Sequence, residues 1–204
     1  MPASRRQQSD RTAATRASVL DATVELLIER GYAGTSTRLA AERAGVSLGA
    51  LQHHFRTKAE LSVEAMRYVT ERLADEFVAA APDSDDLTER FGEILDRLFV
   101  VFKGPTFAAA VEIQLASRTD SDLHQPVREL HLDVEKIILR SATEVLPEIA
   151  SLPDFNAVLQ TSVSAVRGLA IATMDPITEV DEQWTLVRGQ LLDIIDRLIS
   201  RESA

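Results

Sequence analysis

The sequence predicts an all-α protein of about nine helices, and three observations lead to that class. Apolar residues recur at intervals of three and four along most of the 204 residues, which is the period of one helix face. Glycine is scarce, at 8 residues, and no Asn-Gly or similar pair indicates a β-hairpin. The 7 prolines mark boundaries between periodic segments. We predict no strand.

Capping residues set the limits of the first three helices. Gly31 is expected to end the first helix, because glycine tolerates the left-handed conformation found there. Thr35 or Ser36 caps the second helix, and Gly45 ends it. Ser47 caps the third. Two short helices joined by Ala-Gly-Val-Ser, with the glycine at the turn, are typical of a helix-turn-helix.

Proline and glycine separate the remaining helices. Pro82 breaks the chain after the fourth helix, Gly104-Pro105 separates the fifth from the sixth, and the start of the seventh lies around Pro126. The full set of helices is expected at about residues 10–30, 36–44, 47–55, 57–80, 85–103, 106–118, 122–145, 155–174 and 182–201. The chain contains no internal repeat.

Composition excludes several classes of protein. Cysteine is absent, which excludes disulfides, a thiol nucleophile and a cysteine zinc site. Hydrophobic residues make up 45% and charged residues 26%, which is ordinary for a globular protein. No apolar run reaches the roughly 18–20 residues of a membrane span, and the polar N-terminus lacks the apolar segment of a secretory signal. We expect a cytoplasmic protein with no membrane partner.

Charge is distributed unevenly along the chain. The net charge of −10 argues against nucleic-acid binding by the whole molecule. Residues 1–58, however, hold nine Arg and Lys against five Asp and Glu, a net +4, and the rest of the chain sums to −14. Such asymmetry points to a nucleic-acid contact confined to the N-terminal part.

The segment from Gly34 to Leu61 reads GTSTRLAAERAGVSLGALQHHFRTKAEL. It resembles the signature of TetR-family transcriptional repressors, a small hydroxyl pair followed by A-x-x-A-G-V-S-x-G-x-L-Y-x-H-F-x-x-K-x-x-L. The resemblance implies a flexible basic arm at 1–11, a three-helix helix-turn-helix DNA-binding domain at 12–56, and a six-helix ligand-binding and dimerisation domain at 57–204. Gln52 stands where the family usually has tyrosine, which removes an aromatic phosphate contact.

The third helix has a face suited to reading DNA. Leu51 and Phe55 lie four apart and should face inward, which leaves small and polar residues facing outward into a major groove. Arg38 resembles the family position whose arginine reaches a base edge. The predicted DNA-binding residues are Thr35, Thr37, Arg38, Ser47, Leu48, Gly49, Ala50, Gln52, His53, His54 and Lys58. Thr35, Thr37, His53, His54 and Lys58 among them are expected at phosphates.

Two further features have open alternatives. The N-terminal Arg5, Arg6 and Arg11 form an arm that enters a minor groove or remains a solvated tail. His124 and His131 lie seven apart, on one helix face, but no Glu-x-x-His pair accompanies them. With no phosphate loop and no G-x-S-x-G either, we expect no metal, no cofactor and no catalysis.

An effector pocket among the fourth to seventh helices is implied by the resemblance. Phenylalanines cluster between 91 and 107, which would suit an apolar or aromatic ligand with a few polar anchors. The alternative for most of these residues is simple core. The predicted lining residues are Phe91, Leu95, Phe99, Phe102, Phe107, Val111, Glu112, Leu115, His131 and Val134.

The last two helices carry more apolar surface than a monomer core needs. Helix 182–201 has two apolar stripes, and helix 155–174 mixes one stripe with small residues that allow close approach. A two-fold bundle would bury the surplus. The predicted dimer interface comprises Leu159, Val163, Val166, Ala170, Val187, Leu191, Ile194 and Leu198.

Together these features predict a homodimeric, ligand-responsive repressor that binds a palindromic operator in double-stranded DNA and is released by a small effector. A transcriptional activator of the same fold is a near alternative. An all-α small-molecule-binding or enzymatic bundle is the alternative from another class. It differs in predicting no specific retention of DNA.

Overall fold

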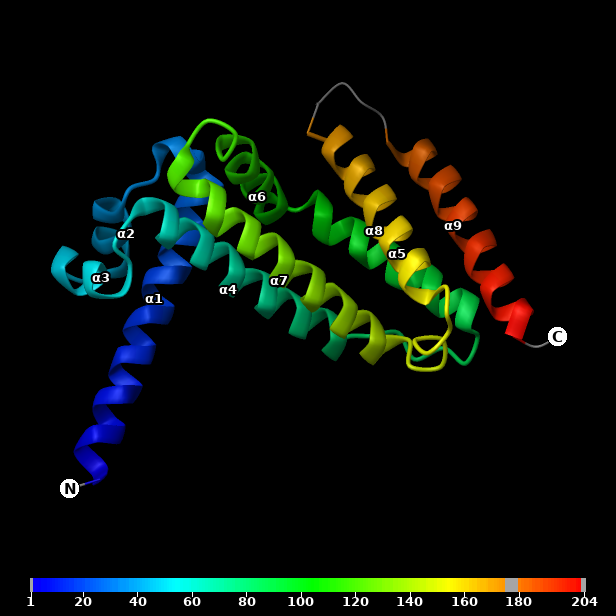
Figure 1. The fold of residues 1–204 in the computed structure, drawn as a ribbon, viewed down its shortest axis with the longest axis horizontal. Coiled ribbons are helices and arrows are strands. Elements are labelled where there is room, and N and C mark those ends of the chain that lie inside the picture. Colours follow the sequence, from blue (N-terminus) through cyan, green and yellow to red (C-terminus); the bar gives the residue numbers. More distant parts are fainter. Residues whose placement is uncertain (1, 175–179, 203–204) are drawn as a thin grey trace. The chain divides into compact units, whose positions relative to one another are not determined.

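A computed structural model of the chain describes the backbone of residues 2–174 and 180–202, and the side chains of residues 12–174 and 180–200. Those residues form nine α-helices and no strand, so the predicted all-α class is confirmed. In chain order the helices are α1 (Pro2–Gly34), α2 (Thr37–Ala44), α3 (Leu48–His54), α4 (Lys58–Ala79), α5 (Leu87–Lys103), α6 (Pro105–Ala116), α7 (Ser121–Val145), α8 (Phe155–Ala172) and α9 (Asp181–Glu202) (Figure 1).

The junctions between the first three helices follow the predicted capping chemistry. Gly31 breaks α1 with φ 66° and ψ 179°, a conformation that glycine tolerates and other residues rarely adopt. Ser36 and Ser47 each accept a hydrogen bond on Oγ from the backbone amide three residues on, both at 3.2 Å. Gly45 ends α2 with φ 68°. Ser36, and not Thr35, therefore caps α2.

Two helix starts differ from the prediction. α1 begins at Pro2, so the segment expected as a flexible arm is helical from residue 2 onward. Proline suits a first helical position, and the arginines and glutamines after it are good helix formers. The side chains of Arg5, Arg6 and Arg11 lie outside the described side chains. α7 begins at Ser121 and contains Pro126 in its second turn.

The chain divides into two compact units. The first unit comprises Met1–Arg72 and Ala109–Val134, and the second comprises Leu73–Ala108 and Glu135–Ala204. This division differs from the boundary expected at residues 56 and 57, because α4, α6 and α7 each contribute residues to both units. In the first unit, α1 packs against α2 and α3. The first unit's largest fully buried side chains include Leu20, Leu26, Leu27, Leu51, Phe55, Leu61 and Met66.

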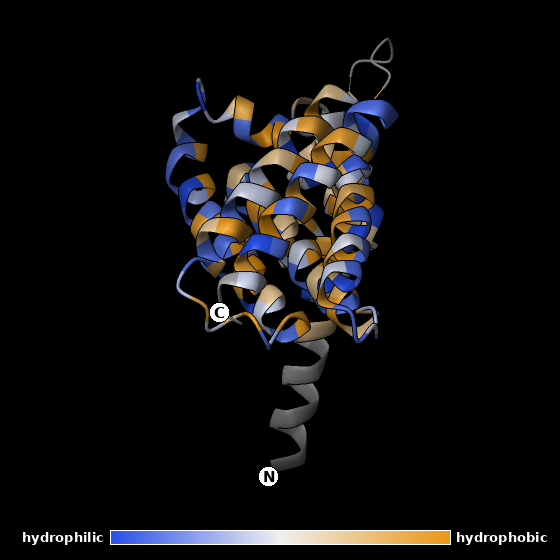
Figure 2. Ribbon diagram, turned by 90° about the vertical axis from the view of Figure 1, so that its right-hand side faces the viewer, coloured by the Kyte–Doolittle hydropathy of each residue, from blue (hydrophilic) through white to orange (hydrophobic). Residues whose placement is uncertain are grey.

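In the second unit, α5 packs against both α8 and α9. The second unit's core contains Phe91, Leu95, Phe99, Phe155, Val166, Ala170, Leu191 and Ile195. Figure 2 shows apolar and polar residues following one another along the helices, as expected when each helix buries one side. In the described part of the chain no single helix is long and apolar enough to cross a membrane. α5 and α6 reach that length and composition only together, as a bent pair.

Candidate nucleic-acid interface

Helix α3 has one buried face and one exposed face. Leu51 and Phe55 are only 0% and 2% exposed, in the core of the first unit. Five other positions of α3 face solvent, and even the apolar side chain of Leu48 among them is 39% exposed. The exposed set is Leu48, Gly49, Ala50, Gln52 and His53. The predicted division of α3 into an inward and an outward face is therefore confirmed, and a groove-reading role for the outward face remains a prediction.

Helix α2 carries an exposed cation, Arg38, in the same unit. The Arg38 side chain is 80% exposed, and its Nε lies 2.9 Å from Oε1 of Glu42 one turn later. Both side chains are well solvated, so this ion pair is weak and can open when a phosphate or base edge competes for the guanidinium. Thr37 is the first residue of α2 and is partly exposed.

Thr35 does not fit its predicted role at a phosphate. The residue is only 3% exposed, and its hydroxyl donates a hydrogen bond to the carbonyl oxygen of Gly31 at 2.8 Å. Its backbone amide donates to the carbonyl of Tyr32 at 3.2 Å. Both donors are used inside the protein, where they hold the turn between α1 and α2.

Lys58 and His54 are less accessible than predicted. The Nζ of Lys58 lies 4.1 Å from the ring centroid of Tyr32 and 3.4 Å from the carbonyl oxygen of Ala33. Burial lowers the pKa of the Lys58 ammonium, and the carboxylates of Asp120 and Glu112 oppose that change. His54 is half-buried. Either side chain would have to move outward to meet a phosphate.

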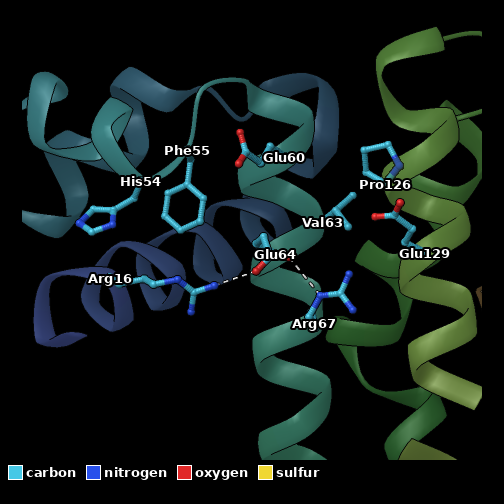
Figure 3. Close-up of a pocket in the computed structure, with 9 residues that line it drawn as sticks. All are labelled: Arg16, His54, Phe55, Glu60, Val63, Glu64, Arg67, Pro126 and Glu129. Atoms are coloured by element: carbon cyan, nitrogen blue, oxygen red, sulfur yellow. Dashed lines mark hydrogen bonds and ion pairs between the residues drawn. The ribbon is translucent and has the colours of Figure 1, made fainter. Parts of the chain in front are cut away.

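A polar pocket lies within the first unit, between α1, α4 and α7 (Figure 3). Its volume is about 360 Å³. Glu64 forms ion pairs with two arginines of the pocket lining. Its Oε2 lies 2.7 Å from Nη2 of Arg16, and its Oε1 lies 3.1 Å from Nε of Arg67. The lining residues are Arg16, His54, Phe55, Glu60, Val63, Glu64, Arg67, Pro126 and Glu129, and none belongs to the predicted effector pocket.

Comparison with known proteins identifies the helix-turn-helix. Residues 19–65 match the family model described as "Bacterial regulatory proteins, tetR family". Residues 19–65 are therefore a TetR-family helix-turn-helix segment. An HTH-type transcriptional regulator of Mycobacterium bovis is 29% identical over 181 residues, which are 87% of this chain and 92% of that protein. CymR of Pseudomonas putida, also an HTH-type transcriptional regulator, is 25% identical over 199 residues, 95% of each chain.

Solved structures have the same fold as this chain. A crystal structure described as a TetR-family transcriptional regulator from Rhodococcus sp. superposes with a TM-score of 0.67, at 22% identity, over 91% of this chain and 98% of that one. The multidrug binding protein EbrR, crystallised with proflavin, has a TM-score of 0.57 at 23% identity, over 90% of this chain and 99% of that one. At these identities the likeness establishes the fold alone.

The residues predicted to line an effector pocket fall into both units. Phe91, Leu95 and Phe99 are buried in the second unit's core, where Phe102 and Phe107 pack ring to ring with centroids 4.8 Å apart. The other five lie in the first unit: Val111, Glu112, Leu115, His131 and Val134. Of these, Leu115 is 59% exposed, and Glu112 accepts a hydrogen bond from the backbone at the break in α1. The ten residues therefore do not form a single pocket within either unit.

The two histidines considered for a metal site, and the residues predicted for a dimer interface, have the following locations. His124 and His131 are both exposed on α7, and no group of three or more His, Asp or Glu among the described side chains is arranged to hold a metal ion. Seven of the eight predicted interface residues belong to, or pack on, the second unit's own core, and the eighth, Val163, is also buried. Five of them are buried: Val163, Val166, Ala170, Leu191 and Leu198. The apolar stripes chosen for an interface are thus core stripes.

The faces of α8 and α9 that remain open were predicted only in part, since the sequence indicated small residues on the 155–174 helix but not the exposed Ile171 and Leu186. A Cβ atom added at Gly168 or Gly189 would meet nothing within 4 Å, and near them Ile171 and Leu186 are 48% and 69% exposed. The signal available in the sequence was the small residues of the 155–174 helix. Tyr32 and Asp120 were also missed. They form a hydrogen bond across 88 residues that no local pattern indicates.

Proposed function

We propose that this chain is a homodimeric repressor of the TetR family that binds a palindromic operator and is released by a small effector. The observation that carries the proposal is the division of α3. Leu51 and Phe55 anchor the helix, so all of its outward residues are spared from packing and available for base contacts. DNA binding of this kind occurs in the cytoplasm and needs a second copy to read both half-sites.

We call the helix pair α2 and α3 the reading head. Within it, Gln52 is the strongest candidate for direct base contact. It is exposed in the middle of α3, and its amide can form two hydrogen bonds with adenine. Leu48 and Ala50 suit a thymine methyl group. Thr37, Arg38, Ser47 and His53 are accessible for phosphates, whereas His54 and Lys58 are half-buried and would act only after rearrangement. The amide of Gly49 can reach a phosphate because no side chain stands in front of it.

Dimerisation would use the open faces of α8 and α9. The absence of side chains at Gly168 and Gly189 allows a partner helix to approach closely, and the exposed Ile171 and Leu186 would lose contact with water. The small residues Ala157 and Ser164 extend the exposed side of α8. This face replaces the interface predicted from the sequence.

An apolar or aromatic effector is supported by two observations. EbrR, which shares the fold, is crystallised with the aromatic compound proflavin. In this chain, Phe102 and Phe107 are only partly buried and already form a tilted aromatic pair. Such an effector acts only through a higher affinity for the conformation that does not fit DNA.

The test of the proposal is selection of bound sequences from random DNA by the full chain at physiological salt. We expect a palindromic consensus. Gln52→Ala should alter the preferred base at one position of each half-site, and Gln183→Ala, an exposed glutamine on α9, should leave the consensus unchanged. An enzymatic or ligand-binding bundle would enrich no sequence. Proflavin can then be added as a probe, and an unchanged affinity for the selected DNA would exclude an effector of that kind.

A further inference from the structure

A side chain of α6 holds the break in α1 that precedes α2. At Gly31 the chain leaves the helical conformation, and the next amide, that of Tyr32, points to the carboxylate of Glu112. The distance from Tyr32 N to Glu112 Oε1 is 2.7 Å, which is typical of a hydrogen bond to a charged acceptor. A Cβ atom at Gly31 would lie closer to that carboxylate than real Cβ atoms come. Glu112 is thus seated directly on the break in α1.

The side chain of Tyr32 strengthens the same junction. Its hydroxyl donates a hydrogen bond to Oδ2 of Asp120 at 3.1 Å, just before α7 begins. The ammonium of Lys58, the first residue of α4, lies over its ring. The carboxylates of Asp120 and Glu112 both attract that ammonium. Residues of α1, α4 and α6 and of the segment before α7 therefore meet at a single tyrosine, and all of these contacts lie within the first unit.

We propose that Glu112 is a positioning residue for the reading head, which rests on the DNA-binding role proposed above. By accepting the Tyr32 amide, it fixes the direction in which the chain leaves α1 and enters α2. Thr35 completes the turn by donating back to Gly31, so the orientation of α2 and α3 depends on an acceptor 80 residues away in the sequence. This role replaces the one predicted for Glu112, that of a polar anchor for an effector.

The hydrogen bond, more than the charge, carries this function. Glu112 is exposed to solvent as a whole, so water and salt weaken its Coulombic attraction to Lys58. The backbone amide of Tyr32, in contrast, belongs to a residue that is only 9% exposed. An amide of this kind needs an acceptor inside the protein. Glu112→Gln keeps an acceptor oxygen and removes the charge, whereas Glu112→Ala removes both.

Hydrogen exchange of the Tyr32 amide in the full chain tests the proposal without DNA. We expect Glu112→Ala to raise its rate at least about tenfold relative to the amide of Met66 in the α4 core, and Glu112→Gln to stay near the wild type. The rate of Met66 itself reports any change in global stability. Gln114→Ala, at an exposed position on the same helix, is the matched control. An unchanged ratio in Glu112→Ala, or an equal rise in Glu112→Gln, would overturn the proposal.

A second measurement connects the junction to DNA. With the DNA selected by the wild-type chain, we expect Glu112→Ala to raise Kd by about three- to tenfold and Glu112→Gln to restore most of the affinity. Equal affinities for all variants would overturn the positioning role. If the wild type selects no DNA, the proposed function fails, but the exchange experiment still reports on the junction.

Discussion

The indole ring of Trp184 stacks on the ring of Phe99, with centroids 4.4 Å apart and planes inclined by 15°. This contact joins α9 to α5. Asp96, one turn before Phe99, accepts a hydrogen bond from the indole Nε1 at 3.0 Å, and the Nε of Arg188 lies 2.9 Å from the same oxygen. A single carboxylate therefore orients both the aromatic stack and the neighbouring arginine. Trp184 is the chain's one tryptophan.

Asp96→Ala should destabilise the second unit. It leaves two half-buried donors without their acceptor, and we expect a loss of about 1 kcal/mol in the free energy of unfolding, limited by the partial exposure of the groups. Urea unfolding followed by circular dichroism measures the change. Glu93→Ala, at an exposed position on α5, is the control and should unfold with the wild type. Coincident curves for all three proteins would show that Asp96 contributes nothing.

Tyr32 should ionise only in strongly alkaline solution. Burial raises the pKa of its phenol to about 12, and the hydrogen bond to Asp120 adds to the effect. In the unfolded chain the phenol has a pKa of about 10. The stabilising contribution of Tyr32 is therefore intact below pH ~10 and is lost as the pH rises through about 12. Tyrosinate absorbance follows the titration. Asp120→Asn should lower the pKa of Tyr32. Tyr32→Phe should remove the part of the absorbance change that occurs near pH 12; if that part persists, it belongs to another group.

Arg38 and Glu42 should have opposite effects on DNA binding. Arg38→Ala removes one exposed cation, so we expect weaker binding to all sequences and a salt slope smaller by about one. Glu42→Ala frees the guanidinium and removes a charge that repels phosphates, so binding should tighten. Fluorescence anisotropy over a range of salt concentrations measures both. Arg97→Ala, on α5 in the second unit, should leave the slope unaltered; an equal fall there would mean that charge acts only through the net total.

Gly168→Trp should prevent dimerisation and leave the monomer folded. The position is exposed and open, and replacing a mid-helix glycine does not disturb α8 itself. A bulky side chain there would keep a partner helix at a distance. Sedimentation equilibrium gives the mass, and circular dichroism checks the helix content. Thr143→Trp, on the exposed side of α7, is the matched control. A dimer that tolerates Gly168→Trp would place the interface elsewhere.

Local chemistry made the helices predictable. Ser36, Gly45 and Ser47 act on backbone groups within four residues of themselves, so their effect can be derived from the sequence alone. The inward direction of Leu51 and Phe55 follows from the helical period in the same way. For this reason the caps of α2 and α3 and the two faces of α3 were predictable, whereas the contacts with DNA remain a prediction. Thr35 is the exception, because its hydroxyl bonds to a turn whose geometry depends on Gly31.

Long-range pairing was not predictable. The helical period identified apolar stripes on α8 and α9, but it could not tell which stripe the monomer uses, and the more apolar ones, such as Val163 and Leu191, are buried in the core. Glu112 illustrates the same limit. A lone glutamate on an amphipathic helix carries no signal that its carboxylate will cap a turn 80 residues earlier.

The cap on α3 leaves one hydrogen atom uncommitted. Ser47 accepts the hydrogen bond from the amide of Ala50 on an oxygen lone pair, and its hydroxyl also has a proton to donate. An aspartate at this position would cap equally well, since a carboxylate is as good an acceptor, but it would have no proton to give and would carry a negative charge. Ser47→Asp therefore separates foldedness from DNA binding at a single side chain. It would yield a well-folded protein, still able to dimerise, that the phosphate backbone repels.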